Sequence, residues 1–95
     1  MSAPEILVLG SVNLDLIVHA PRLPLPGETL RGHRFGSCLG GKGANQACAA
    51  AKLGPGCSVR LIGCTGNDSF AVHLRASLAE AGVDTTLVRH SETEA

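Results

Sequence analysis

The fold is decided by residues 36–47, which read Gly36-Ser37-Cys38-Leu39-Gly40-Gly41-Lys42-Gly43-Ala44-Asn45-Gln46-Ala47. Glycines run here directly into an alanine-rich segment, and alanine is the strongest helix former. We therefore predict a helix over residues 44–53 that is ended by Gly54-Pro55. A glycine-rich turn at the start of a helix presents free backbone N–H groups and the positive end of the helix dipole. Such a turn suits phosphate, carboxylate or the hydroxyl oxygens of a sugar.

Before and after this predicted helix in the sequence, there are short apolar runs and one further helical pattern. Residues 5–10 form a continuous apolar run, which predicts a strand buried on both faces of a parallel sheet. The other predicted elements are a helix, capped by Asp68 or Ser69 and ended by Gly82, and strands over residues 12–19, 58–64 and 83–89. This alternation predicts an α/β fold with right-handed crossovers onto a mainly parallel sheet, within a single unit of residues 1–95.

The predicted strand over residues 12–19 carries two polar side chains. A period of two residues places Asn13 and Asp15 together on one side of the sheet and Leu14 on the other. Prolines and a Pro-Gly turn interrupt the chain after this strand. Residues 29–35 do not separate into a core face and a solvent face, so we predict a short extended arm that acts as a flap.

The sequence of the glycine-rich turn nearly matches two phosphate-binding motifs, but it satisfies neither of them. Gly36 and Gly41-Lys42 have the spacing of a P-loop, but Gly43 stands where that motif needs Ser or Thr to hold magnesium. The dinucleotide fingerprint fails as well, because Gln46 stands where a third Gly or Ala belongs. The remaining alternatives are a ligand other than a nucleotide, or a tight turn without a ligand.

Asn13 and Asp15 bear on that choice. A neutral polyol would satisfy them, because a carboxylate accepts hydrogen bonds from two adjacent hydroxyls while an amide both donates and accepts. The alternative is that Asp15 is satisfied within the protein by N–H groups of the glycine-rich turn. The residues alone leave both possibilities open.

Composition excludes several classes of function. Eight basic and eight acidic residues give zero net charge, and only 2% of the residues are aromatic, so neither nucleic acid nor an anionic membrane is an expected partner. No apolar run is long enough to span a bilayer, and no basic segment precedes the first apolar run as in a secretory signal. The four cysteines are too sparse for a disulfide-stapled domain and form no C-x-x-C motif, which favours a reducing cytoplasm.

Three motifs follow one another over nearly the whole chain: Gly10-Ser11-Val12-Asn13-Leu14-Asp15, Leu23-Pro24-Leu25-Pro26-Gly27-Glu28-Thr29 and Gly40-Gly41-Lys42-Gly43-Ala44-Asn45-Gln46-Ala47. In this order they resemble the ribokinase family of sugar and nucleoside kinases. The resemblance implies a Rossmann-like ribokinase fold with a mainly parallel central sheet and a small β lid at about residues 17–36. It also implies that residues 1–95 are the N-terminal part of a ribokinase-like domain.

The function implied by the resemblance is ATP-dependent phosphorylation of D-ribose to D-ribose 5-phosphate, with Mg²⁺ and activation by a monovalent cation such as K⁺. The implied sugar-binding residues are Asn13, Leu14, Asp15, Gly41, Lys42, Gly43, Ala44 and Asn45. The family's ATP site and catalytic base are expected outside these residues, so the 95 residues alone are expected to be inactive. The lid is expected to pair with that of a second copy in a homodimer. The expected location of the protein is the cytoplasm, and presence in the nucleus is left open.

Two alternatives accompany this interpretation. The first is a related kinase that acts on another sugar or on a nucleoside. The second is a non-catalytic truncated isoform that acts as a binding or dimerisation module.

Overall fold

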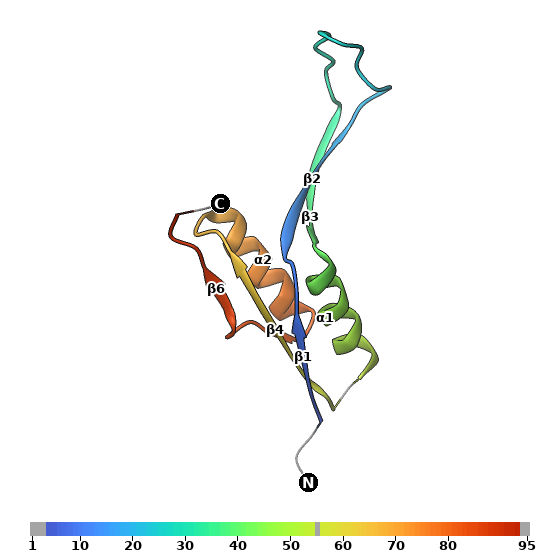
Figure 1. Ribbon diagram of the computed structural model, residues 1–95. Helices are drawn as coiled ribbons and strands as arrows, with labels where there is room; N and C mark the ends of the chain where they lie inside the picture. The colour runs from blue at the N-terminus through green and yellow to red at the C-terminus, as the bar shows by residue number, and fades with distance from the viewer. Residues whose placement is uncertain (1–3, 55, 94–95) are drawn as a thin grey trace.

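The computed structural model describes residues 4–54 and 56–93 (Figure 1). The elements in chain order are β1 (Glu5–Leu9), β2 (Asn13–His19), β3 (Arg34–Gly40), α1 (Lys42–Leu53), β4 (Ser58–Thr65), α2 (Ser69–Glu80), β5 (Val83–Asp84) and β6 (Val88–His90). The predicted α/β class is confirmed, because strands and helices form one layered body from which a strand pair projects.

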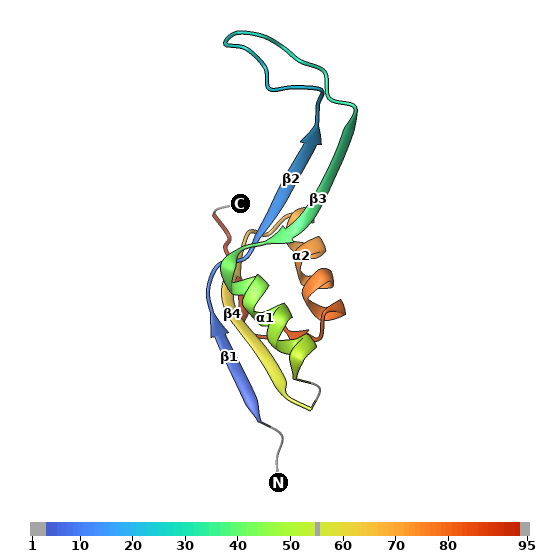
Figure 2. The same cartoon turned by 90° about the vertical axis from the view of Figure 1, so that its right-hand side faces the viewer.

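The body is a parallel sheet with β4 at its centre. β4 pairs with β1 along one edge and with β5 and β6 along the other, and every pair is parallel. Figure 2 shows α1 and α2 on the same side of this sheet, as two successive right-handed crossovers require. The core fills the space between the sheet and the helices, and its buried residues are Val8, Ala44, Ala47, Val59, Leu61, Leu78, Val83 and Val88.

β2 and β3 form an antiparallel hairpin that stands away from this body (Figures 1 and 2). The register pairs Asn13 with Gly40 at the base and His19 with Arg34 near the far end. The hairpin makes the molecule elongated, with extents of 61 × 31 × 18 Å. The residues of the predicted extended arm, 29–35, lie in the outer loop of this hairpin and at the start of β3, and their role as a flap stays a prediction.

The boundaries of the flap differ from the prediction. A short extended arm was predicted over residues 29–35, but β3 begins at Arg34 and continues through the glycines to Gly40. Glycine is a poor strand former, so its density alone favoured a turn. Pairing with all seven residues of β2 overrides that preference, and the turn is reduced to Gly41. Helix α1 accordingly begins at Lys42, two residues before the predicted start.

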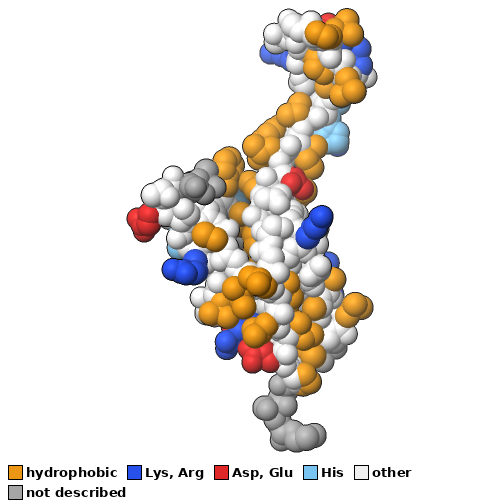
Figure 3. Space-filling view, viewed as in Figure 1, with side chains coloured by type: hydrophobic (Ala, Val, Ile, Leu, Met, Phe, Trp, Pro, Cys, Tyr) orange, Lys and Arg blue, Asp and Glu red, His pale blue; other side chains and the backbone are white. Residues whose placement is uncertain are grey.

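The prediction that the first strand is buried on both faces is wrong for this chain. Leu7 is 57% exposed and Leu9 is 79% exposed, whereas Val8 is buried. Both helices cover the same face of the sheet, so within residues 4–54 and 56–93 no helix covers the alternate residues Leu7 and Leu9 of β1. Figure 3 shows the hydrophobic side chains that gather on this open face of the sheet.

The strand predicted over residues 83–89 is two short strands separated by a turn. Asp84 Oδ1 accepts hydrogen bonds from the N–H and the hydroxyl of Thr86, which is a local alternative to continued pairing. The Arg75 guanidinium of α2 donates to the carbonyls of Thr85 and Val88. The predicted cap of α2 is confirmed, since Asp68 Oδ1 accepts the Ala71 N–H at 3.0 Å.

Candidate functional site

Asn13 and Asp15 lie side by side on one face of the hairpin, at the point where β2 leaves the body. The Asn13 amide donates to Asp15 Oδ1 over 2.8 Å. Both side chains lie above Gly40 of β3, where an added Cβ would come within 2.7 Å of Asn13 Nδ2 and of Asp15 Oδ2. Glycine at residue 40 is therefore what allows the polar pair to lie flat against the neighbouring strand.

Gly40 leads directly into the turn that starts α1. Gly41 has a φ of 99°, a conformation that glycine adopts without strain. A Cβ at Gly41 would lie 2.5 Å from the carbonyl oxygen of Ser11, in the link between β1 and β2. The turn and the start of β2 are thus in close backbone contact, which brings the third sequence motif to the first.

Ser11 holds this contact with two hydrogen bonds. Its hydroxyl oxygen accepts the N–H of Lys42 at 3.0 Å, and its carbonyl oxygen accepts the N–H of Ala44 at 3.0 Å. Sequence reasoning missed this role. Serine is a common helix-capping residue, but here it lies 31 residues before the helix that it caps, so no local pattern could show it.

These bonds change what the start of α1 can bind. Because Ser11 occupies the N–H groups of Lys42 and Ala44, the turn lacks the row of free donors that a phosphate cradle uses. The side chains of Lys42 and Asn45 are exposed at the first turn of α1, where they remain able to donate. The chemistry favoured at this surface is that of separate polar side chains, which suits a hydroxyl-rich ligand.

The remaining sequence-predicted residues do not share this surface. The side chain of Leu14 lies on the other face of β2, as strand alternation requires. Gly43 is buried, and a Cβ there would come within 2.5 Å of the backbone of Gly10. Ala44 is fully buried in the core. These three residues shape the backbone at the site, and their assignment as sugar contacts stays a prediction.

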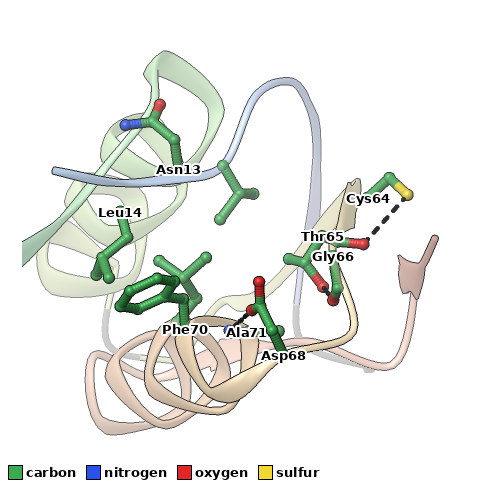
Figure 4. A pocket seen from close by; sticks show the side chains of 10 residues that line it. Asn13, Leu14, Cys64, Thr65, Gly66, Asp68, Phe70 and Ala71 are labelled. Atoms are coloured by element: carbon green, nitrogen blue, oxygen red, sulfur yellow. Dashed lines mark hydrogen bonds between the residues drawn. The ribbon is translucent and has the colours of Figure 1, made fainter. Parts of the chain in front are cut away.

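The other face of β2 borders a pocket of about 220 Å³, which sequence reasoning did not find (Figure 4). Leu14 points toward Phe70 of α2 across this pocket, while the Asn13 amide points away from it. Asp68 and the Thr65–Gly66 backbone form its polar end. Asn13 thus borders the pocket, but its amide group lies on the other face of β2, with Asp15.

The described residues contain neither a cluster of metal-ligating side chains nor a helix that could cross a membrane. Within residues 4–54 and 56–93, no three side chains of His, Cys, Asp or Glu come together as metal ligands. The described residues thus form no cluster of carboxylate ligands for Mg²⁺. Neither described helix has the length and apolar character needed to cross a membrane.

Comparisons with known proteins identify relatives of this arrangement. Residues 3–95 match the family described as pfkB family carbohydrate kinase. Over 79 residues the chain is 47% identical to a ribokinase of Haemophilus influenzae, and over 84 residues it is 43% identical to a deoxyribokinase of Salmonella typhi. A solved structure of Arabidopsis thaliana ribokinase with ribose and ATP superposes with a TM-score of 0.82 at 34% identity.

Each match covers most of this chain but only a small part of the relative. The alignments cover 83% of this chain and 25% of the Haemophilus protein, 88% and 27% for the Salmonella protein, and 99% and 30% for the Arabidopsis structure. The chain thus spans between a quarter and a third of the length of these relatives. The ribokinase fold implied by the sequence motifs is confirmed by the superposition. The chain belongs to the pfkB family of carbohydrate kinases.

Proposed function

We propose that the chain forms the sugar-binding part of an ATP-dependent kinase that converts D-ribose and ATP to D-ribose 5-phosphate and ADP. The observation that carries the proposal is the Asn13–Asp15 pair above Gly40, beside a helix start where Ser11 accepts the N–H groups of Lys42 and Ala44. Asp15 Oδ2 and the carbonyl of the Asn13 amide can accept bonds from adjacent sugar hydroxyls. Lys42 and Asn45 would add donors from the start of α1.

The nature of the sugar rests on the relatives. The Arabidopsis structure carries ribose and ATP, which supports this pair of substrates. The similarity to a deoxyribokinase favours one specific alternative, a sugar that lacks a hydroxyl of ribose. The two sugars differ at a single hydroxyl, so their relative affinities decide between these functions.

We assign none of the described residues as a catalytic residue, and we propose that residues 1–95 do not transfer phosphate alone. Mg²⁺ and K⁺ would accompany ATP in the reaction, but we place neither ion on this chain. The free state of all four cysteines supports a reducing location such as the cytoplasm. The second alternative, a non-catalytic binding module, predicts sugar binding without any phosphate transfer.

The test of the proposed function is a calorimetric titration of the chain with D-ribose and with 2-deoxy-D-ribose, with circular dichroism to verify folding. Asp15→Ala should weaken ribose binding by about 1.5–3 kcal/mol, roughly 10- to 150-fold, because it removes charge-assisted hydrogen bonds. Ser37→Ala removes an exposed hydroxyl from the opposite face of the hairpin and serves as the control. A folded wild-type chain that binds neither sugar, or an Asp15→Ala chain that binds ribose unchanged, would contradict the proposal.

We further propose that the hairpin is a lid, with residues 17–36 as its mobile part, and that it pairs with a second copy. The face opposite Asn13 and Asp15 carries Leu16, Val18 and Phe35, which are 55%, 61% and 67% exposed. An apolar face of this kind is typical of a protein–protein contact. Phe35→Ser should shift the protein toward monomer in sedimentation velocity, whereas Leu53→Ser, at the far end of α1, should not. Equal sedimentation of all three proteins would reject the lid dimer.

A further inference from the structure

The link between β1 and β2 fixes the relation between the two halves of the candidate site. One half, Asn13 and Asp15, follows this link directly in the sequence. The other half, at Gly41 and Lys42, follows the long hairpin excursion and returns to the same place. The hairpin register places Gly40 beside Asn13, and the contact across the link then sets the course of the chain from Gly41 to Lys42.

Two glycines make that contact possible. A Cβ on Gly10 would lie 2.8 Å from the α-carbon of Gly43, and a Cβ on Gly43 would lie 2.5 Å from the carbonyl carbon of Gly10. The two backbones therefore meet with no side chain between them. Gly10 is itself tied to the sheet, because its N–H donates to the carbonyl of Ile62 over 3.2 Å.

Within this contact, the side chain of Ser11 caps α1. The N-cap residue of α1 is Gly41, which has no side chain to accept the first N–H groups of the helix. The Ser11 hydroxyl accepts the Lys42 N–H in its place. Its bond to Ala44 uses the backbone carbonyl and does not depend on the side chain, whereas the Lys42 bond depends on the hydroxyl alone.

Loss of that hydroxyl would free the peptide between Gly41 and Lys42. Gly41 can adopt many backbone conformations, since glycine has no Cβ to restrict it. The Lys42 N–H would then have to find water or turn away from β2. The α-carbon that carries the Lys42 side chain is bonded to this peptide group. The direction of the Lys42 side chain relative to Asp15 would therefore no longer be fixed.

We propose that Ser11 is a positioning residue for sugar binding, which fixes the start of α1 against the start of β2 so that both halves present one prepared surface. This inference rests on the proposed function, because it concerns the same site. Ser11 acts through Lys42 and is not itself proposed to touch the sugar. A sugar that binds a loosened turn must first order it, and this ordering reduces its affinity.

The test compares D-ribose affinity in four variants of the chain by calorimetry. Ser11→Ala should weaken binding about 3- to 30-fold, the range expected for loss of a helix cap. Ser11→Thr keeps the hydroxyl at an exposed residue and should restore binding. Ser11→Cys keeps the size of the side chain with a weak acceptor, so it should also weaken binding and serves if Ser11→Ala does not fold. Ala49→Gly destabilises the same helix on its exposed face and should leave ribose affinity unchanged.

A second readout separates positioning from stability. Hydrogen exchange at the Lys42 amide should become faster in Ser11→Ala and stay slow in Ala49→Gly, although both variants melt at a lower temperature than wild type. Equal ribose affinity in wild type and Ser11→Ala, or equal weakening by Ala49→Gly, would overturn the inference. A folded wild-type chain that does not bind ribose would overturn the proposed function and this inference together, so the two failures are distinguishable.

Discussion

The parallel sheet and the β2–β3 hairpin are built from similar apolar residues, yet they bury them very differently. In the sheet, Leu61 of β4 is fully buried beneath the two helices. In the hairpin, Leu16 of β2 is 55% exposed. Strand alternation gives each element an apolar face, but only the sheet has helices to cover that face. The body therefore supplies stability, while the base of the hairpin is free to carry the exposed polar groups of Asn13 and Asp15.

The largest expected effect contrasts these two leucines. Leu61→Ala should destabilise the chain by about 2–5 kcal/mol, because it leaves a cavity in a thin core. Leu16→Ala should change the free energy of unfolding by only about 0.5 kcal/mol, because the side chain is already half in water. Urea unfolding followed by circular dichroism measures both. Similar losses in the two variants would mean that the hairpin is covered in solution, which the proposed lid dimer would explain.

A smaller effect contrasts two glycines. Gly43→Ala should cost about 1–3 kcal/mol, because the new methyl group would overlap the backbone of Gly10, which cannot move aside easily. Gly36→Ala in β3 is the control, since a Cβ there meets nothing within 4 Å. It should be neutral or slightly stabilising, because alanine restricts the unfolded chain. A Gly43→Ala variant as stable as Gly36→Ala would show that the two backbones are not in tight contact.

The contrast between the regions also separates what the sequence could predict from what it could not. Period two correctly placed Asn13 and Asp15 together, since their mutual hydrogen bond requires a shared face. The helices were predicted because alanine content, a capping Asp68 and terminal glycines are local signals. Each of these features depends on residues within one element.

The errors share a different cause, which is dependence on a distant partner. The strand character of residues 36–40 comes from pairing with β2 and not from the glycines themselves. The exposure of Leu7 and Leu9 depends on which face the helices cover. The role of Ser11 depends on a helix that begins 31 residues later. Single-sequence patterns carry none of these relations.

The smallest expected effect lies at the tip of the hairpin and depends on pH. The guanidinium of Arg22, 2.6 Å from Glu28, holds the pKa of the Glu28 carboxyl below its usual range, with help from the Leu25 N–H. A lowered pKa in the folded protein means that the ionised form stabilises the tip above the ordinary glutamate pKa. That contribution is lost as pH falls through the lowered pKa, so protease cleavage within residues 20–33 should increase in acid.

The control for the tip is Glu28→Gln. This variant should already be cleaved faster within residues 20–33 at neutral pH, and its cleavage rate should no longer depend on acid. The body has its own titrating group, because the N–H and hydroxyl of Thr86 lower the pKa of Asp84. Asp84→Asn should therefore change how protease cleavage in the sheet depends on pH. It should leave the acid-dependent cleavage at the hairpin tip unchanged. If Glu28→Gln still showed acid-dependent cleavage at the tip, the loosening would start in the body, and the two regions would not respond to pH independently.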